Sequence, residues 1–210
     1  MIIQLKQHTA KETVQQIAEK YEAVILEKEN YITLVTPSSI KKISEEFNSS
    51  IEKSWVFDSD IQLSSKKYIS QKREVAIGNY VIGGKSGNTA IIIGPCGVES
   101  KEQITLTAEL IKELGLQTLR AGSFKPRTSP YSFQGMGIPG LELLAEIRSR
   151  YGFPIVTEVR DSTHADAVIE AADVIQIGAK AMYDHGILRK CGKTNKPVLL
   201  KRSFGSTLQE

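Results

Sequence analysis

Three basic residues follow one strand candidate within eight positions of the sequence. The strand candidate Gln117–Leu119 runs into Arg120, Lys125 and Arg127, in the stretch LRAGSFKPRTSPYSFQG. Like charges repel at this spacing, so their clustering indicates that an anion binds among them. Phosphate and carboxylate are the anions that Arg and Lys bind most often. The spacing therefore predicts an anion-binding site where this strand ends.

Cys96 is a second candidate, because it follows the apolar stretch Ile91–Ile93 in the sequence GPCGVES. A lone Cys after a strand is usually a small buried hydrophobe, and the alternative is a thiolate that binds a metal ion. The chain has one other cysteine, Cys191, so no disulfide framework is predicted and a reducing cytoplasm is the expected location.

These residues need neighbouring strands to position them, and residues 90–210 supply a regular alternation of strand and helix candidates. The strand candidates are Ala90–Ile93, Gln117–Leu119, Pro154–Thr157, Asp173–Ile177 and Val198–Leu200. Near-continuous apolar strands between helices predict a parallel sheet covered by helices. The polar residues that follow the strands are, in order, Cys96, Arg120, Glu158, Lys180 and Lys201. A TIM barrel builds its active site at this end of its strands.

The fold class that this pattern predicts is α/β, an incomplete (β/α)8 TIM barrel of about five βα units. A doubly wound sheet is the alternative, but no G-x-G-x-x-G follows the first strand. Five strands are three short of a barrel, so we expect an open sheet edge.

Residues 1–57 predict a small α+β domain that precedes the barrel. The pattern reads strand, helix, strand, strand, helix, strand, with the second helix opening at Thr36-Pro37 and carrying the apolar stripe Ile40, Ile43 and Phe47. This order is typical of a ferredoxin-like domain. Residues 58–89 read as a polar linker followed by a hairpin over Val75–Gly84, which we expect to plug one end of the barrel domain, residues 90–210.

The overall composition indicates a globular protein without a membrane span or a nucleic-acid surface. The net charge is +3, from 27 basic and 24 acidic residues spread evenly along the chain. No basic stripe favours nucleic acid, no apolar run of 18 residues occurs, and the N-terminus lacks a signal-peptide layout. The basic residues are therefore expected to act at a local site and not through the net charge of the protein.

The motifs GPCGVES, LRAGSFKPRTSPYSFQG, VTEVRD, IQIGAK and PVLLKR, in this order, resemble those of 3-deoxy-D-arabino-heptulosonate 7-phosphate (DAHP) synthases. The similarity is greatest to the subfamily with an N-terminal ferredoxin-like regulatory domain. The sister enzyme, 3-deoxy-octulosonate 8-phosphate (KDO8P) synthase, carries a KANRSS-like motif in place of KPRTSPYSFQG. The resemblance implies a transferase that condenses phosphoenolpyruvate with erythrose 4-phosphate, the first step of the shikimate pathway to the aromatic amino acids.

The resemblance also implies roles for individual residues. Arg120, Lys125 and Lys201 match residues that hold phosphoenolpyruvate. Ala179 and Lys180 fall in a substrate-binding motif, where Lys180 stands in place of the usual Arg. Arg127 and Thr128 match the pair that binds the phosphate of erythrose 4-phosphate. Lys125 and Glu158 are the catalytic candidates, with Glu158 expected to position water or cations.

The family uses a divalent metal ion of the Mn, Fe, Co or Zn class, and the resemblance makes Cys96 its Cys ligand. The family's His, Glu and Asp ligands lie after the fifth strand and have no counterpart in this sequence. Two hypotheses follow: a DAHP synthase whose C-terminal third is absent, or a non-catalytic relative that binds an aromatic amino acid or a phosphorylated ligand. The resemblance further suggests feedback by Tyr or Phe and a homo-oligomer.

Overall fold

The computed structural model describes residues 1–27, 30–125, 127, 129–208 and 210. The chain divides into two compact units, Met1–Lys72 together with Thr207–Glu210, and Arg73–Ser206. Each unit has its own hydrophobic core, so each is described by itself.

The first unit is a sheet with a helix packed on it. Its elements are β1 (Ile2–Leu5), α1 (Lys11–Lys20), β2 (Val24–Glu27), β3 (Ile32–Val35), the 3-10 helix η1 (Glu45–Ser50) and β4 (Ile51–Trp55). The strand order is β2-β3-β1-β4 and each neighbouring pair is antiparallel. The buried face of α1, made by Val14, Ile17 and Ala18, packs against the apolar residues of β1 and β3.

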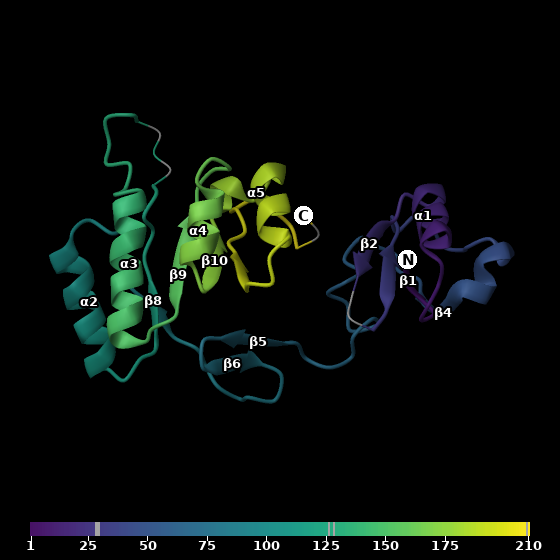
Figure 1. Cartoon of the computed structure of the whole chain (residues 1–210), viewed down its shortest axis with the longest axis horizontal. Helices are drawn as coiled ribbons and strands as arrows, with labels where there is room; N and C mark the ends of the chain where they lie inside the picture. Colours follow the sequence, from purple (N-terminus) through teal and green to yellow (C-terminus); the bar gives the residue numbers. More distant parts are fainter. Residues whose placement is uncertain (28–29, 126, 128, 209) are drawn as a thin grey trace. The chain divides into compact units, whose positions relative to one another are not determined.

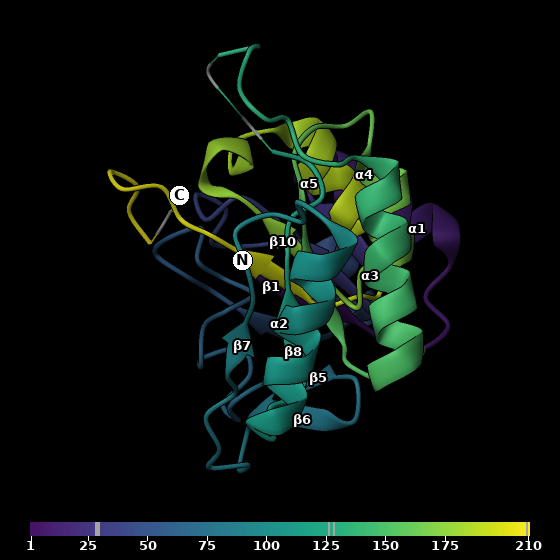
Figure 2. The same cartoon turned by 90° about the vertical axis from the view of Figure 1, so that its left-hand side faces the viewer.

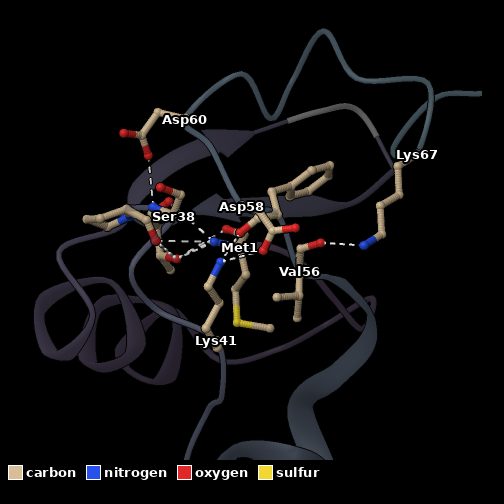
Figure 3. A network of polar contacts seen from close by, with 10 residues as sticks. Met1, Ser38, Lys41, Val56, Asp58, Asp60 and Lys67 are labelled. Atoms are coloured by element: carbon tan, nitrogen blue, oxygen red, sulfur yellow. Dashed lines mark hydrogen bonds and ion pairs between the residues drawn. The ribbon is translucent and has the colours of Figure 1, made fainter. Parts of the chain in front are cut away.

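The expected α-helix after Thr36-Pro37 is wrong, since the structure places only the short η1 between β3 and β4 in the part of the chain that it describes. Thr36 does not cap a helix because its hydroxyl accepts a hydrogen bond from the Met1 amino group at 2.8 Å. The Ser38 backbone N–H is likewise taken by Asp60 Oδ1, at 2.8 Å. Figure 3 shows this network around the chain start. The predicted stripe still packs on the core without forming a helical face.

The second unit contains a parallel sheet and the helices that cover it. Its elements are β5 (Glu74–Ile77), β6 (Tyr80–Gly83), β7 (Ile92–Ile93), α2 (Lys101–Glu113), β8 (Thr118–Arg120), α3 (Ile138–Tyr151), β9 (Ile155–Val159), α4 (Ala165–Ala171), β10 (Val174–Ile177), the 3-10 helix η2 (Ala179–Ala181), α5 (His185–Gly192) and β11 (Val198–Leu200). The sheet order is β11-β10-β9-β8-β7, with every neighbouring pair parallel.

This sheet is a curled half-barrel, which confirms the α/β barrel prediction at that level. A doubly wound sheet would reverse its strand order at a switch point, whereas here each strand pairs with the next along the chain. The helices pack on one face of the sheet, where they share a core with Leu119, Ile155 and Ile175 (Figures 1 and 2). None of the helices in the described ranges is both long and apolar enough to cross a membrane.

The hairpin β5–β6 covers the other face of the half-barrel near the amino ends of its strands (Figure 1). Ile77 packs there against Val156 and Val174, with Tyr80 and Ile82 beside them. The hydroxyls of Tyr80 and Thr118 share a hydrogen bond of 2.5 Å. The hairpin therefore closes one end of the half-barrel, as the sequence predicted.

The substitution Ile77→Ala tests this closure. Ile77 is 3% exposed, so the truncation leaves a cavity between hairpin and sheet, and we expect the second unit to lose about 2–5 kcal/mol of unfolding free energy. Chemical denaturation followed by circular dichroism measures the loss. The control Val81→Ala changes a residue of the same hairpin that is 38% exposed and is expected to cost about 0.5 kcal/mol or less. Equal losses in both variants would contradict the packing described.

Candidate functional site

The carboxyl ends of β8, β9 and β10 present polar side chains on the face away from the helices. Side chains alternate along a strand, so Leu119 and Ile175 point to the helical core while Arg120 and Gln176 take the opposite face. In the parallel register, Gln176 lies opposite Glu158 and Arg120 lies opposite Val156. The side chain of Arg120 therefore extends beyond its own register position to meet the other two.

Arg120 is the centre of the resulting network. Its Nε donates to Gln176 Oε1 at 3.1 Å and its Nη2 donates to Glu158 Oε2 at 3.2 Å. Its Nη1 donates to the backbone carbonyls of Cys96, at 3.1 Å, and Pro95, at 3.3 Å. The ion pair with Glu158 is well shielded, because the two side chains are 19% and 14% exposed. The guanidinium thus joins the strand ends of β8, β9 and β10 to the loop after β7.

Gln176 was missed by the sequence analysis. It is 3% exposed, and its Nε2 donates to Glu158 Oε2 at 2.5 Å. One signal could have found it: Gln176 is the only polar residue in the strand VIQI. A polar side chain in an otherwise apolar buried strand must find hydrogen-bond partners.

Lys125 and Cys96 form a second contact pair beside Arg120. Lys125 is 5% exposed, and its Nζ donates to Cys96 Sγ at 3.2 Å and also to the Cys96 carbonyl. The aliphatic part of Lys125 lies over Gly97 and Gly122. A Cβ on Gly97 would come within 2.6 Å of Lys125 Cε, and one on Gly122 within 2.9 Å of Nζ. The two glycines leave the space in which the lysine side chain lies.

The surroundings of Cys96 lower the pKa of its thiol. The hydrogen bond from Lys125 is the largest cause, followed by the positive charge of Lys125, and Arg120 adds to both effects. These cations stabilise the thiolate, while partial burial opposes it. Cys191 behaves in the opposite way, because burial in the core raises its pKa. Cys96 is exposed as well, so it is the thiolate that this site offers to a ligand.

Four other predicted residues follow the strands β8, β10 and β11 in the chain and lie outside this contact network as far as the described contacts show: Arg127, Ala179, Lys180 and Lys201. Arg127 is exposed, and its Nε donates to the Phe133 carbonyl at 3.2 Å. Ala179 and Lys180 lie in η2 directly after β10, with Lys180 exposed. Lys201 follows β11 and is exposed, and its backbone N–H donates to the Ile177 carbonyl at 2.9 Å. Thr128 lies outside the described residues.

A complete metal site is not formed by the residues described. Among them, no group of three or more His, Cys, Asp and Glu side chains lies close enough to hold a metal ion. Cys96 offers one thiolate, whereas protein sites for catalytic divalent ions usually supply three or more ligands. The residues present therefore fit one ligand position of such a site.

The fold and the cluster define a barrel-type α/β protein with a cationic site at the carboxyl ends of its strands. The chain belongs to the DAHP synthetase I family, whose sequence model matches residues 60–210. The matched residues include the half-barrel and all of the polar side chains described above.

Individual relatives agree with the family assignment. A phospho-2-dehydro-3-deoxyheptonate aldolase of Thermotoga maritima is 45% identical over 149 residues, which are 71% of this chain and 44% of that protein. A 2-dehydro-3-deoxyphosphooctonate aldolase of Fusobacterium nucleatum is 33% identical over 141 residues, 64% of this chain and 50% of that protein. The chain thus spans about half the length of the curated relatives it matches.

Two solved structures are also similar to this chain in their fold. The crystal structure of the Thermotoga maritima DAHP synthase aligns with a TM-score of 0.69 and 35% identity, over 99% of this chain and 63% of that chain. A truncated form of the Thermotoga maritima 3-deoxy-D-arabino-heptulosonate 7-phosphate synthase aligns with a TM-score of 0.60 and 38% identity, over 69% of this chain and 51% of that chain.

The contact between Lys125 and Cys96 predicts how the thiol titrates. Because Lys125 lowers the pKa of Cys96, we expect Lys125→Met to move the pH midpoint of Cys96 alkylation upward. Iodoacetamide labelling across a pH series, in a chelator and read by mass spectrometry, measures the midpoint. Cys191 is an internal control that should label slowly in the folded chain. Lys101→Met, which removes an exposed lysine paired with Glu146, should leave the midpoint unchanged. An unchanged midpoint in Lys125→Met would contradict the assigned cause.

Proposed function

We propose that this chain has the function of a DAHP synthase. The reaction condenses phosphoenolpyruvate with erythrose 4-phosphate and water, and yields 3-deoxy-D-arabino-heptulosonate 7-phosphate and phosphate. The observation that carries the proposal is the cluster of the shielded cations Arg120 and Lys125 with the exposed Cys96 at the carboxyl ends of the strands. It lies within the region that is 45% identical to the Thermotoga aldolase.

The proposed roles follow from charge and position. Arg120 and Lys125 hold the charged groups of phosphoenolpyruvate, and Lys180, Ala179 and Lys201 complete its site from the neighbouring strand ends. Lys125 is well placed for this role because its ammonium is held by the Cys96 carbonyl and thiol and by the two glycines beneath it. Clustered donors in a shielded site bind anions more strongly than the same groups in water.

A second group of roles concerns the acceptor sugar and water. Arg127 and Thr128 bind the phosphate of erythrose 4-phosphate. In the reaction the enol carbon of phosphoenolpyruvate attacks the aldehyde carbon, and water adds at the carbon left electron-poor. The C–O bond to phosphate then breaks and that carbon becomes the ketone carbonyl. Of the two protons of water, one balances the proton taken up by the aldehyde oxygen and the other leaves with the phosphate. Glu158 orients that water and accepts its proton, while Arg120 holds the carboxylate in place through their ion pair.

Cys96 is proposed as one ligand of a divalent metal ion, which as a Lewis acid would polarise the aldehyde of the acceptor sugar. This role is supported by the exposed thiol and by its lowered pKa. The metal could be of the Mn, Fe, Co or Zn class.

Residues 1–57 are proposed to be a ferredoxin-like regulatory domain that binds Tyr or Phe. The strand order β2-β3-β1-β4 with antiparallel neighbours supports this topology, as does the alignment of the Thermotoga synthase over 99% of the chain. A homo-oligomer in the cytoplasm is the proposed setting. Titration calorimetry with Tyr and with Phe tests the effector, and binding of neither would count against it.

A second candidate function is a non-catalytic protein that binds phosphoenolpyruvate or a similar phosphorylated ligand. This candidate is favoured because the site has one metal ligand, the thiolate of Cys96, and the described residues contain no group of three or more possible ligands. A KDO8P synthase-like reaction is disfavoured, because identity to the 2-dehydro-3-deoxyphosphooctonate aldolase is 33%, against 45% for the heptonate aldolase.

Calorimetric titration of the purified chain with phosphoenolpyruvate tests the binding that all roles share. Arg120→Met and Lys125→Met should each weaken binding roughly tenfold or more, because each removes a charge-assisted hydrogen bond worth about 1.5–3 kcal/mol. Arg150→Met is the matched control, since Arg150 lies at the end of α3 beside Tyr151. Failure of the wild-type chain to bind, or equal affinity in all variants, would contradict the proposed site.

High turnover would decide between the two candidate functions. With phosphoenolpyruvate, erythrose 4-phosphate and Mn²⁺, the purified 210-residue chain is expected to form little product, since a lone thiolate retains a divalent ion poorly. Substituting arabinose 5-phosphate as the acceptor tests the KDO8P-type reaction in the same assay. Robust metal-dependent synthesis of the heptulosonate would overturn the expected low turnover and dismiss the non-catalytic candidate.

A further inference from the structure

The side-chain amide of Gln176 lies between the two charged residues of the site. It accepts from Arg120 Nε at 3.1 Å and donates to Glu158 Oε2 at 2.5 Å. The orientation of the amide is unique, because a guanidinium only donates and a carboxylate only accepts. Gln176 is 3% exposed, so water does not replace these partners easily. The Gln176 amide therefore hydrogen-bonds to the guanidinium and to the carboxylate at the same time.

The contacts of Gln176 determine how Arg120 and Glu158 pair with each other. An arginine and a carboxylate prefer two parallel hydrogen bonds, which would use Nε and Nη2 together with both carboxylate oxygens. Here Gln176 occupies Nε, and it shares the Glu158 oxygen, Oε2, that Arg120 Nη2 contacts. The other oxygen, Oε1, lies against Gly178, where a Cβ would come within 2.1 Å of it. The ion pair is held in a one-point geometry.

In a one-point pair, both the Arg120 guanidinium and the Glu158 carboxylate can still interact with a substrate. In a two-point pair the carboxylate would cover the guanidinium edge and neutralise it, so an incoming anion would have to break two charge-assisted bonds. Held by one oxygen, Glu158 leaves the Nε–H to the neutral amide oxygen of Gln176. The guanidinium is therefore less neutralised than in a two-point pair, and an anion has one charge-assisted bond to displace instead of two. The Glu158 side chain is in turn oriented by its hydrogen bond from the Gln176 amide.

We propose that Gln176 is a positioning residue that prevents Arg120 and Glu158 from closing into a two-point ion pair, and so keeps the arginine available to an anionic substrate. That the substrate is phosphoenolpyruvate rests on the proposed function. The positioning of Arg120 and Glu158 by Gln176 does not rest on it, so the positioning role and the proposed function can be tested separately.

Two substitutions separate the two hydrogen bonds. Gln176→Met keeps the size of the side chain and removes both bonds. Gln176→Glu keeps the acceptor for Arg120 Nε and loses the donor to Glu158 while both carboxyls are ionised. Two adjacent carboxyls share one proton as the pH falls, and that proton restores the missing donor. Only the Glu substitution should therefore recover at low pH. Lys125 and Cys96 contact each other beside Arg120, and Lys180 and Lys201 follow the neighbouring strands β10 and β11. All four residues are unchanged in the two variants.

The first measurement follows the Arg120 Nε–H by nuclear magnetic resonance of ¹⁵N-labelled chain. In the wild type this proton is held by Gln176 and should exchange slowly with water. At low pH, where the shared proton restores the donor to Glu158, we expect Gln176→Glu to approach the wild-type signal. In Gln176→Met we expect a shifted, two-point environment with Glu158. A signal that is identical in wild type and Gln176→Met would overturn the positioning role whatever the ligand is.

The second measurement is the affinity for phosphoenolpyruvate relative to wild type at the same pH. Gln176→Met should bind roughly tenfold more weakly at about pH 8 and at about pH 5. Gln176→Glu should be weak at the higher pH and approach wild type at the lower. Gln117→Met, at the opposite end of β8, is the matched control and should bind like wild type. Wild-type affinity in Gln176→Met would overturn the inference.

The outcomes distinguish the inference from the proposed function. If the wild-type chain does not bind phosphoenolpyruvate, the proposed function fails and the Nε–H signal alone decides the positioning role. If the wild type binds and the Met variant binds equally well, the function stands and the inference fails. Thermal unfolding of each variant identifies any that has lost its fold, and Gln176→Glu then carries the test, since a purely structural role predicts no recovery at low pH.

Discussion

The guanidinium of Arg120 is the interaction on which the rest of the site depends. A charge this well shielded needs hydrogen-bond partners for its donors, because an unpaired buried charge is strongly destabilising. Nε, Nη1 and Nη2 each find an oxygen, on Gln176, on the loop after β7 and on Glu158. The same contacts bind the ends of β8, β9 and β10 to that loop. One cation thus orders the edge of the sheet where the chemistry is proposed to occur.

Backbone packing is the second requirement of the site, and it explains the glycines around it. Gly97 and Gly122 form an isolated parallel bridge, and the Val98 N–H donates to the Gly122 carbonyl at 3.1 Å. This close approach of two backbones leaves a narrow passage through which the side chain of Lys125 reaches Cys96. The ammonium then sets the chemistry of the thiol by lowering its pKa. The two glycines leave room for the Lys125 side chain, and Lys125 stabilises the thiolate of Cys96.

The two ends of the half-barrel differ in their residues: one end is packed with apolar side chains, and the other carries the polar residues of the proposed site. At the amino ends of the strands, the hairpin β5–β6 covers the inner face with apolar residues such as Ile77. At the carboxyl ends, the inner face carries Arg120, Glu158 and Gln176 instead. This division is expected of barrel proteins, whose function lies at the carboxyl ends of the strands. Both ends lie within residues 60–210, which the family model matches.

The order of strands and helices in residues 90–210 could be predicted from the amino-acid sequence, and with it a parallel half-barrel whose strand ends carry Cys96, Arg120 and Glu158. This was possible because apolar periodicity and strand-end residues are local properties of the chain. The one-oxygen pairing of Arg120 with Glu158, and the place of Gln176 between them, became visible in the folded chain, since contacts across parallel strands depend on register and stagger. The second helix of residues 1–57 was predicted wrongly for the same reason: its capping residue, Thr36, is taken by the distant Met1 amino group, a competitor that local sequence does not reveal.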